Sequence, residues 1–138
     1  MTQSRSGVFI AFYKRLFAVP MFWKIWLVCL AVLNLLSAYL LIVESRGSII
    51  LVALTIGVVL GTALYRHFGY TRILGLMHVP WIPMTYLLWA GLLPATVVAA
   101  TVVQATVILN VQCQGIDTVE VIRYVLGNRT DVGSKPQA

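Results

Sequence analysis

Charged side chains are scarce in this sequence, and acidic ones are the scarcest. Only 10% of the 138 residues are charged and four are Asp or Glu, whereas about a quarter of an average soluble domain is charged. Hydrophobic residues make up 60% of the chain. The net charge of +6 comes from Lys and Arg between apolar runs, not from a basic face. These features exclude a soluble domain and argue against nucleic acid as a partner.

Cysteine is nearly absent, and the spacings that metal sites use are missing. Cys29 and Cys113 form no C-x-x-C pair, so neither a disulfide framework nor a zinc site is expected. His67 lies in a predicted loop and His78 inside a predicted span, so they are badly placed to hold one haem iron. We therefore expect no metal and no cofactor.

Patterns typical of catalysis are lacking as well. The sequence has no nucleophile beside a base, no paired carboxylates and no glycine-rich phosphate loop. Four spans of roughly 20 residues each leave no room for a separate catalytic domain. The sequence thus predicts a protein that is not an enzyme.

Long apolar runs are what the sequence has in abundance. Each is close to the roughly 20 residues that a helix needs to cross the hydrocarbon core. The four runs are about 25–43, 49–65, 73–90 and 95–111. We predict an all-α fold, with a bundle of four transmembrane helices in residues 24–113 and short interfacial helices at both ends.

Basic residues lie almost entirely on one side of these spans. Nine of the ten Lys and Arg precede the first span, separate the second from the third, or follow the fourth, and only Arg46 falls on the other side. Basic residues favour the cytoplasmic side, which predicts that both termini are cytoplasmic, in an inner (plasma) membrane. The residues expected to set the topology and meet lipid headgroups are Lys14, Arg15, Lys24, Arg66, Arg72 and Arg123.

The segments that flank the spans are predicted to lie at the membrane surface. Val8–Val19 is apolar with two basic residues, and Pro20 separates it from the first span. Asp117–Leu126 begins with a possible capping box and stops at Gly127. We expect a cytoplasmic tail and interfacial helix in residues 1–23, and an amphipathic helix followed by a flexible tail in 114–138.

A few polar residues fall inside the spans, where each needs a partner. No Asp, Glu, Lys or Arg is among them, which argues against a proton-coupled pump. Judged by depth alone, Asn34 pairs with Gln104, and His78 pairs with Thr62 or Asn110. These pairs are interpreted either as interhelical hydrogen bonds or as the lining of a narrow polar path or ligand pocket.

The third span is the least regular. Pro80 and Pro83 remove the backbone donors that would bond the carbonyls of Leu76 and Val79, so a kink is expected. Trp81 lies too deep for the interfacial aromatic belt and is expected to pack inward. If the protein has a site, we expect it beside this kink.

Small residues repeat every fourth position along the second span, at Ala53, Gly57 and Gly61. Such a face lets another helix approach closely. The sequence leaves open whether that helix belongs to this chain or to another protein.

Two stretches carry a resemblance: Tyr70–His78, which enters the third span, and Asp117–Gly127, which follows the fourth. They resemble a group of uncharacterised small bacterial inner-membrane proteins with four predicted spans. The resemblance covers about a fifth of the chain. It implies a bacterial inner membrane and draws attention to Arg72, His78 and Arg123, without a role for any of them.

The first of three functional hypotheses is a non-enzymatic accessory or regulatory subunit that acts through helix contacts with another membrane protein or with a second copy of itself. The second is a small homo-oligomeric transporter or channel, with a path along the kinked third helix lined by His78, Trp81, Asn34 and Gln104. The third is a protein that binds a lipid or quinone at the basic inner rim. Membrane lipids are the partner common to all three.

Overall fold

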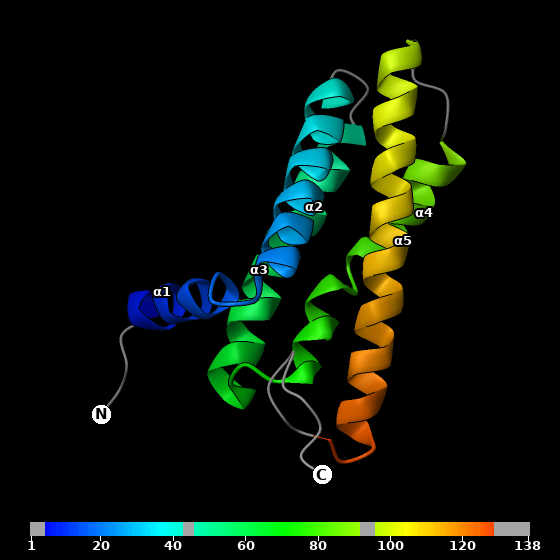
Figure 1. Cartoon of the computed structure of the whole chain (residues 1–138). Coiled ribbons are helices and arrows are strands. Elements are labelled where there is room, and N and C mark those ends of the chain that lie inside the picture. Colours follow the sequence, from blue (N-terminus) through cyan, green and yellow to red (C-terminus); the bar gives the residue numbers. More distant parts are fainter. Residues whose placement is uncertain (1–4, 43–45, 92–95, 129–138) are drawn as a thin grey trace.

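The structure is a computed structural model that describes residues 5–42, 46–91 and 96–128. Helices dominate this part of the chain (Figure 1). In chain order they are α1 (Arg5–Leu16), α2 (Met21–Leu40), α3 (Arg46–Phe68), the 3-10 helix η2 (Arg72–His78), α4 (Trp81–Ala90) and α5 (Val97–Val125).

The longer helices lie side by side, and neighbours in the chain run in opposite directions (Figure 1). The bent pair of η2 and α4 packs between α3 and α5, while α2 also packs on both α3 and α5. Helix α1 runs crosswise to the bundle, beside the second half of α3 (Figure 1). It is anchored to α3 by Phe12, which is buried and has its ring 5.4 Å from that of Tyr65.

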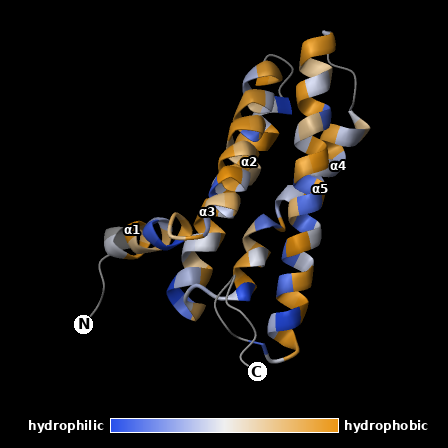
Figure 2. Cartoon of the chain, viewed as in Figure 1, coloured by the Kyte–Doolittle hydropathy of each residue, from blue (hydrophilic) through white to orange (hydrophobic). Residues whose placement is uncertain are grey.

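Hydrophobic residues predominate along the helices (Figure 2), and many of their large side chains are exposed on the outside of the bundle. Helices α2, α3 and α5 are each long and apolar enough to cross a membrane, and the bent pair η2 and α4 meets the same criteria when taken together. Only 22% of the apolar stretch of α2 is buried within the protein, and 28% of those of α3 and α5. Apolar surface on this scale indicates a membrane-embedded protein. The prediction of an all-α membrane protein is confirmed at this level.

The third predicted span is broken, as the two prolines suggest. A 3-10 segment ends at His78, α4 starts at Trp81, and the two helices meet at an angle of 42°. The carbonyls that the prolines were expected to free are nonetheless bonded. Val79 N donates to Leu76 O, and Ile82 N donates to Val79 O, each at 3.1 Å. Tighter turns thus replace the lost α-helical bonds.

One predicted helix boundary is wrong. The sequence suggested a span ending near Val111 and a separate helix starting at Asp117, but α5 is a single helix of 29 residues. Its N-cap is Thr96, whose side chain accepts a hydrogen bond from Ala99 N at 3.2 Å. Nothing between the two predicted segments breaks a helix, because Gly115 stands alone there. Asp117 therefore lies inside a helix and does not cap one.

Candidate functional site

A buried polar seam joins α2 to α5. Asn34 Nδ2 donates to Asn110 Oδ1 at 2.9 Å, and Asn110 Nδ2 donates back to Asn34 Oδ1 at 3.1 Å. Both residues are fully buried, whereas Gln104, the predicted partner of Asn34, is exposed. The predicted pairing was wrong in depth and in direction, because Gln104 lies six residues, or about 9 Å, along α5 from Asn110. Six residues along a helix turn the side chain by about 600°, which leaves Gln104 about 120° away from Asn110 around α5.

The same seam continues through a hydroxyl pair that the sequence reasoning missed. Ser37 Oγ and Thr106 Oγ1 lie 2.7 Å apart, and both residues are fully buried. Ser37 follows Asn34 by three residues and Thr106 precedes Asn110 by four, so spacing along each helix was the available signal. The seam fastens two helices together and does not line a cavity.

The small-residue face of α3 is filled from within the chain. A Cβ atom at Gly57 would lie 3.1 Å from Met77 O and from Trp81 Nε1, and one at Gly61 would lie 3.0 Å from Met77 Sδ. Ala53, Gly57 and Gly61 are all buried, as is Trp81. Close approach of the irregular third span therefore uses this face.

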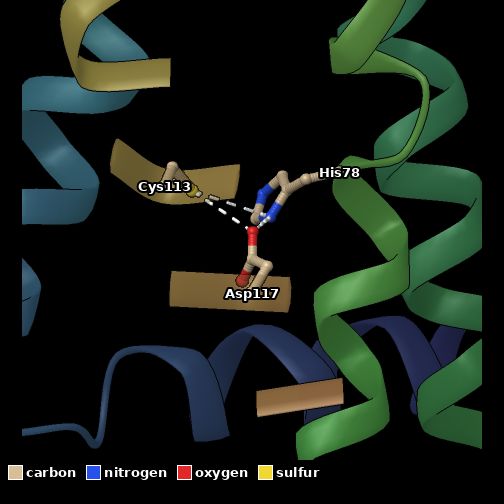
Figure 3. Close-up of side chains that lie close together, drawn as sticks. All are labelled: His78, Cys113 and Asp117. Carbon is tan, nitrogen blue, oxygen red and sulfur yellow. Dashed lines mark hydrogen bonds and ion pairs between the residues drawn. The ribbon is translucent and has the colours of Figure 1, made fainter. Parts of the chain in front are cut away.

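Three side chains with metal-binding or acid–base chemistry meet at the break in the third span (Figure 3). His78 Nδ1 donates to Asp117 Oδ2 at 2.6 Å, and the Cys113 thiol donates to the same oxygen at 3.4 Å. Cys113 Sγ lies 3.8 Å from His78 Nδ1. The predicted partners of His78 were wrong, since Thr62 donates to Val58 O on its own helix and Asn110 pairs with Asn34.

Local packing explains how His78 and Asp117 come together. Gly75 of η2 lets this helix approach α5 closely. A Cβ atom at this position would lie 3.0 Å from both the Cβ and the carbonyl oxygen of Asp117, so a side chain there would collide with α5. The Trp81 ring packs edge-on against the His78 ring, with centroids 4.5 Å apart. Cys113 and Asp117 are four residues apart and share one face of α5. The sequence reasoning missed this cluster because it placed Asp117 on a separate surface helix.

A second group of charges lies one turn further along α5. Arg72 is buried and forms an ion pair with Glu120, which also accepts a hydrogen bond from Arg123 at 3.1 Å. Arg72 was expected in a loop between spans at the lipid headgroups, but it belongs to η2 and points into the bundle. Burial of a guanidinium requires such a carboxylate partner. The remaining topology residues, Lys14, Arg15, Lys24 and Arg66, lie on α1, α2 and α3 near the same end of the molecule.

A cavity of about 530 Å³ connects these groups. One wall is apolar and aromatic and comes from α1 and the start of α2. The other, called the polar wall, comes from η2 and α5 and carries charged and polar side chains beside the apolar Leu74, Met77 and Ile116. The apolar wall includes Phe12, Leu16, Trp23, Trp26 and Leu27, and the polar wall includes Arg72, His78, Asp117, Glu120 and Arg123. The three residues emphasised by the resemblance, Arg72, His78 and Arg123, all line it. A molecule with a polar head and an apolar body fits these two walls.

Comparison with known proteins adds no family to this description. The resemblance of Tyr70–His78 and Asp117–Gly127 to four-span bacterial proteins stays a prediction, and the function must be argued from the cavity and its walls. No protein-family model matches the chain, and neither a curated protein nor a solved structure matches it at a significant level.

Proposed function

We propose that this chain is a non-enzymatic, four-span protein of a bacterial inner membrane that binds a zwitterionic phospholipid in the cavity between α1, α2, η2 and α5. The observation that carries the proposal is the cavity of about 530 Å³, with one aromatic wall and one wall of paired charges. Its ligand would come directly from the surrounding bilayer.

The arrangement of the helices supports the four-span topology. The start of α2 and the end of α5 lie at the same end of the bundle, which requires an even number of crossings (Figure 1). Counting η2 and α4 as one bent span gives four. Arg66 and Arg123 lie at this end and Arg46 at the other, so basic residues favour a cytoplasmic location for both termini and for the cavity. Reporter fusions at both termini test this: an active periplasmic reporter at either one contradicts it.

The charges of the polar wall favour a zwitterionic headgroup over a purely anionic one. Arg72 and Arg123 offer guanidinium groups for a phosphate, but Asp117 and Glu120 lie on the same wall and repel a second negative charge. An ammonium group on the ligand meets these carboxylates favourably. Trp26 and the other aromatic residues then face the glycerol and upper acyl chains, as aromatic side chains do at membrane interfaces.

The two other hypotheses receive less support from the geometry. An accessory subunit was suggested by the small-residue face of α3, but Gly57 and Gly61 are used in packing within the chain. A polar path was expected to be lined by His78, Trp81, Asn34 and Gln104. Asn34 is instead fully buried and bonded to Asn110, and Gln104 is exposed on the outside of α5. The small-residue face of α3 therefore does not support helix contacts with another protein.

Native mass spectrometry of the full chain, released from bilayer discs of phosphatidylethanolamine and phosphatidylglycerol, tests the lipid proposal. We expect one retained phosphatidylethanolamine, because the cavity binds both of its charges. Trp26→Ala removes part of the apolar wall and is expected to lose this adduct. Trp89→Ala, on an exposed side chain of α4 outside the cavity, is the matched control and is expected to keep it.

Two results would refute the proposal. One is a wild-type protein that retains no lipid, or retains phosphatidylglycerol as readily as phosphatidylethanolamine. The other is equal loss of the adduct from Trp26→Ala and Trp89→Ala, which would place lipid on the outer surface of the bundle and not in the cavity.

A further inference from the structure

We propose that His78, Cys113 and Asp117 form a binding site for a divalent transition-metal ion of the zinc type, with a fourth coordination position that opens into the cavity. This inference goes beyond lipid binding and does not rest on it, because it needs only these three side chains and access for an ion.

The spacing of the three donor atoms is close to that of zinc ligands. Bonds of about 2.3 Å to sulfur and about 2.0 Å to nitrogen and oxygen, in a tetrahedron, place sulfur about 3.5 Å from either partner and nitrogen about 3.3 Å from oxygen. Cys113 Sγ is 3.4 Å from Asp117 Oδ2 and 3.8 Å from His78 Nδ1. Both separations agree with these values within about 0.3 Å.

The third separation, between His78 Nδ1 and Asp117 Oδ2, is shorter than that of two zinc ligands, and metal binding would remove the cause. His78 Nδ1 and Asp117 Oδ2 are 2.6 Å apart because a hydrogen bond joins them. Two ligands of one ion have no proton between them and stand about 0.7 Å further apart. A small rotation of the Asp117 side chain, which is 21% exposed at the cavity, supplies this change.

The same three residue types could form a nucleophile, base and acid, but their arrangement does not suit that chemistry. In such a triad the imidazole uses one nitrogen for the nucleophile and the other for the carboxylate. Here Cys113 Sγ and Asp117 Oδ2 both lie next to Nδ1 of His78, and next to each other (Figure 3). All three donor atoms lie within 4.8 Å of one another, and so converge on one point as metal ligands do.

The surroundings provide support on one side and access on the other. Cys113 is buried in the core, and the His78 ring is held by Trp81 at a centroid distance of 4.5 Å. All three ligands also line the cavity, so an ion has a path to them and room for a water or ligand oxygen as the fourth donor. One thiolate, one imidazole and one carboxylate with an open position is a donor set that Zn²⁺ accepts.

Protons balance in the binding step. The Cys113 thiol loses its proton to solvent and becomes a thiolate ligand. The hydrogen on His78 Nδ1 moves to Nε2, which leaves Nδ1 free to bind and the imidazole neutral. Asp117 accepts no proton. One proton is thus released per Zn²⁺ bound, and affinity falls as the pH is lowered.

The test uses the full chain in detergent and in bilayer discs. After dialysis against micromolar Zn²⁺, elemental analysis is expected to find about one zinc per chain. With Co²⁺ as a spectroscopic probe, a thiolate-to-cobalt charge-transfer band is expected, since Cys113 supplies sulfur. Cys113→Ser should abolish the band and weaken Zn²⁺ binding at least about tenfold. Asp117→Asn should weaken Zn²⁺ binding to the same extent.

The chain offers a matched control for two of the ligands. Cys29→Ser removes the other cysteine, which is exposed on α2, and His67→Gln removes the other histidine, which is exposed on α3. Both variants are expected to bind one zinc with unchanged affinity. An unchanged elution profile in size-exclusion chromatography confirms that each variant is folded.

The proposal is overturned if folded wild-type protein binds no Zn²⁺ at micromolar concentration, or if its Co²⁺ complex lacks the sulfur band. These two measurements need no variant, so a misfolded Cys113→Ser protein does not weaken the test. Equal effects of Cys113→Ser and Cys29→Ser would also overturn it, because binding would then lie elsewhere.

Discussion

Replacing the two asparagines of the polar seam by leucine tests how α2 and α5 are held together. Leucine has the same branched shape as asparagine, is larger, and cannot form hydrogen bonds. In Asn34→Leu the Asn110 amide loses both hydrogen bonds to its partner and stays fully buried. Leaving a buried polar group unpaired costs about 2 kcal/mol, and we expect this loss of unfolding free energy from Asn34→Leu. Asn110→Leu should cost less, about 1.5 kcal/mol, because the Asn34 amide keeps its hydrogen bond to Leu30 O.

The double variant Asn34→Leu/Asn110→Leu is expected to be more stable than either single variant. It loses two interhelical hydrogen bonds, worth about 0.6 kcal/mol each in a membrane protein, but leaves no amide unpaired. Its cost should therefore be about 1.2 kcal/mol, compared with about 3.5 kcal/mol if the single effects simply added. The coupling between the two positions is then about 2.3 kcal/mol.

Unfolding of all three variants in mixed micelles, followed by circular dichroism against denaturing detergent, measures these differences. Gln104→Leu serves as the control, since this exposed side chain should change stability by less than about 0.5 kcal/mol. A double variant whose loss equals the sum of the singles would refute the reasoning. So would a Gln104→Leu variant as unstable as Asn34→Leu, because Gln104 would then be the partner.

Four further substitutions give expected outcomes in the same unfolding assay. Gly47→Ala should lower the free energy of unfolding by about 1–3 kcal/mol, because a Cβ atom there overlaps backbone atoms of α2. Gly115→Ala should raise it by up to about 1 kcal/mol, because a Cβ atom there meets nothing within 4 Å. Similar effects at both sites would contradict the packing. Arg72→Met should lose about 3 kcal/mol, since it leaves Glu120 without its buried partner, and a neutral result would mean that the pair is solvated. Trp81→Phe should change stability by less than about 1 kcal/mol, because its buried indole N–H has no hydrogen-bond partner among the described residues; a larger loss would reveal one.

Hydrophobicity was enough to predict the membrane character and the approximate positions of the long helices. The prolines were enough to predict the break at Pro80. These features depend on composition and on local backbone chemistry, which a sequence displays directly. The inward packing expected of Trp81 also follows from depth, and the residue is buried. The prediction of a separate helix at Asp117 was wrong, because a polar segment after an apolar one was taken for a new helix. Nothing in that segment ends α5.

Partners across helices were hard to predict. The structure brings Asn34 level with Asn110, which lies six residues, or about 9 Å, further along α5 than Gln104 and on another face of that helix. The cavity and the cluster of His78, Cys113 and Asp117 depend on how η2 docks against α5, and Gly75 decides this through the lack of a side chain. Such docking joins residues far apart in the chain, and no spacing rule in one sequence records it.

The length of α5 links the cavity to bilayer thickness. Its 29 residues extend about 43 Å, whereas the hydrocarbon core measures about 30 Å. In the proposed orientation about 13 Å of rigid helix must therefore stand in the headgroup layer, or α5 must tilt. The α5 residues of the polar wall lie on this part of the helix. In a thicker membrane a tilted α5 would become upright, while α1 on the opposite wall stays at the surface, so the separation of the two walls should follow the local lipid composition.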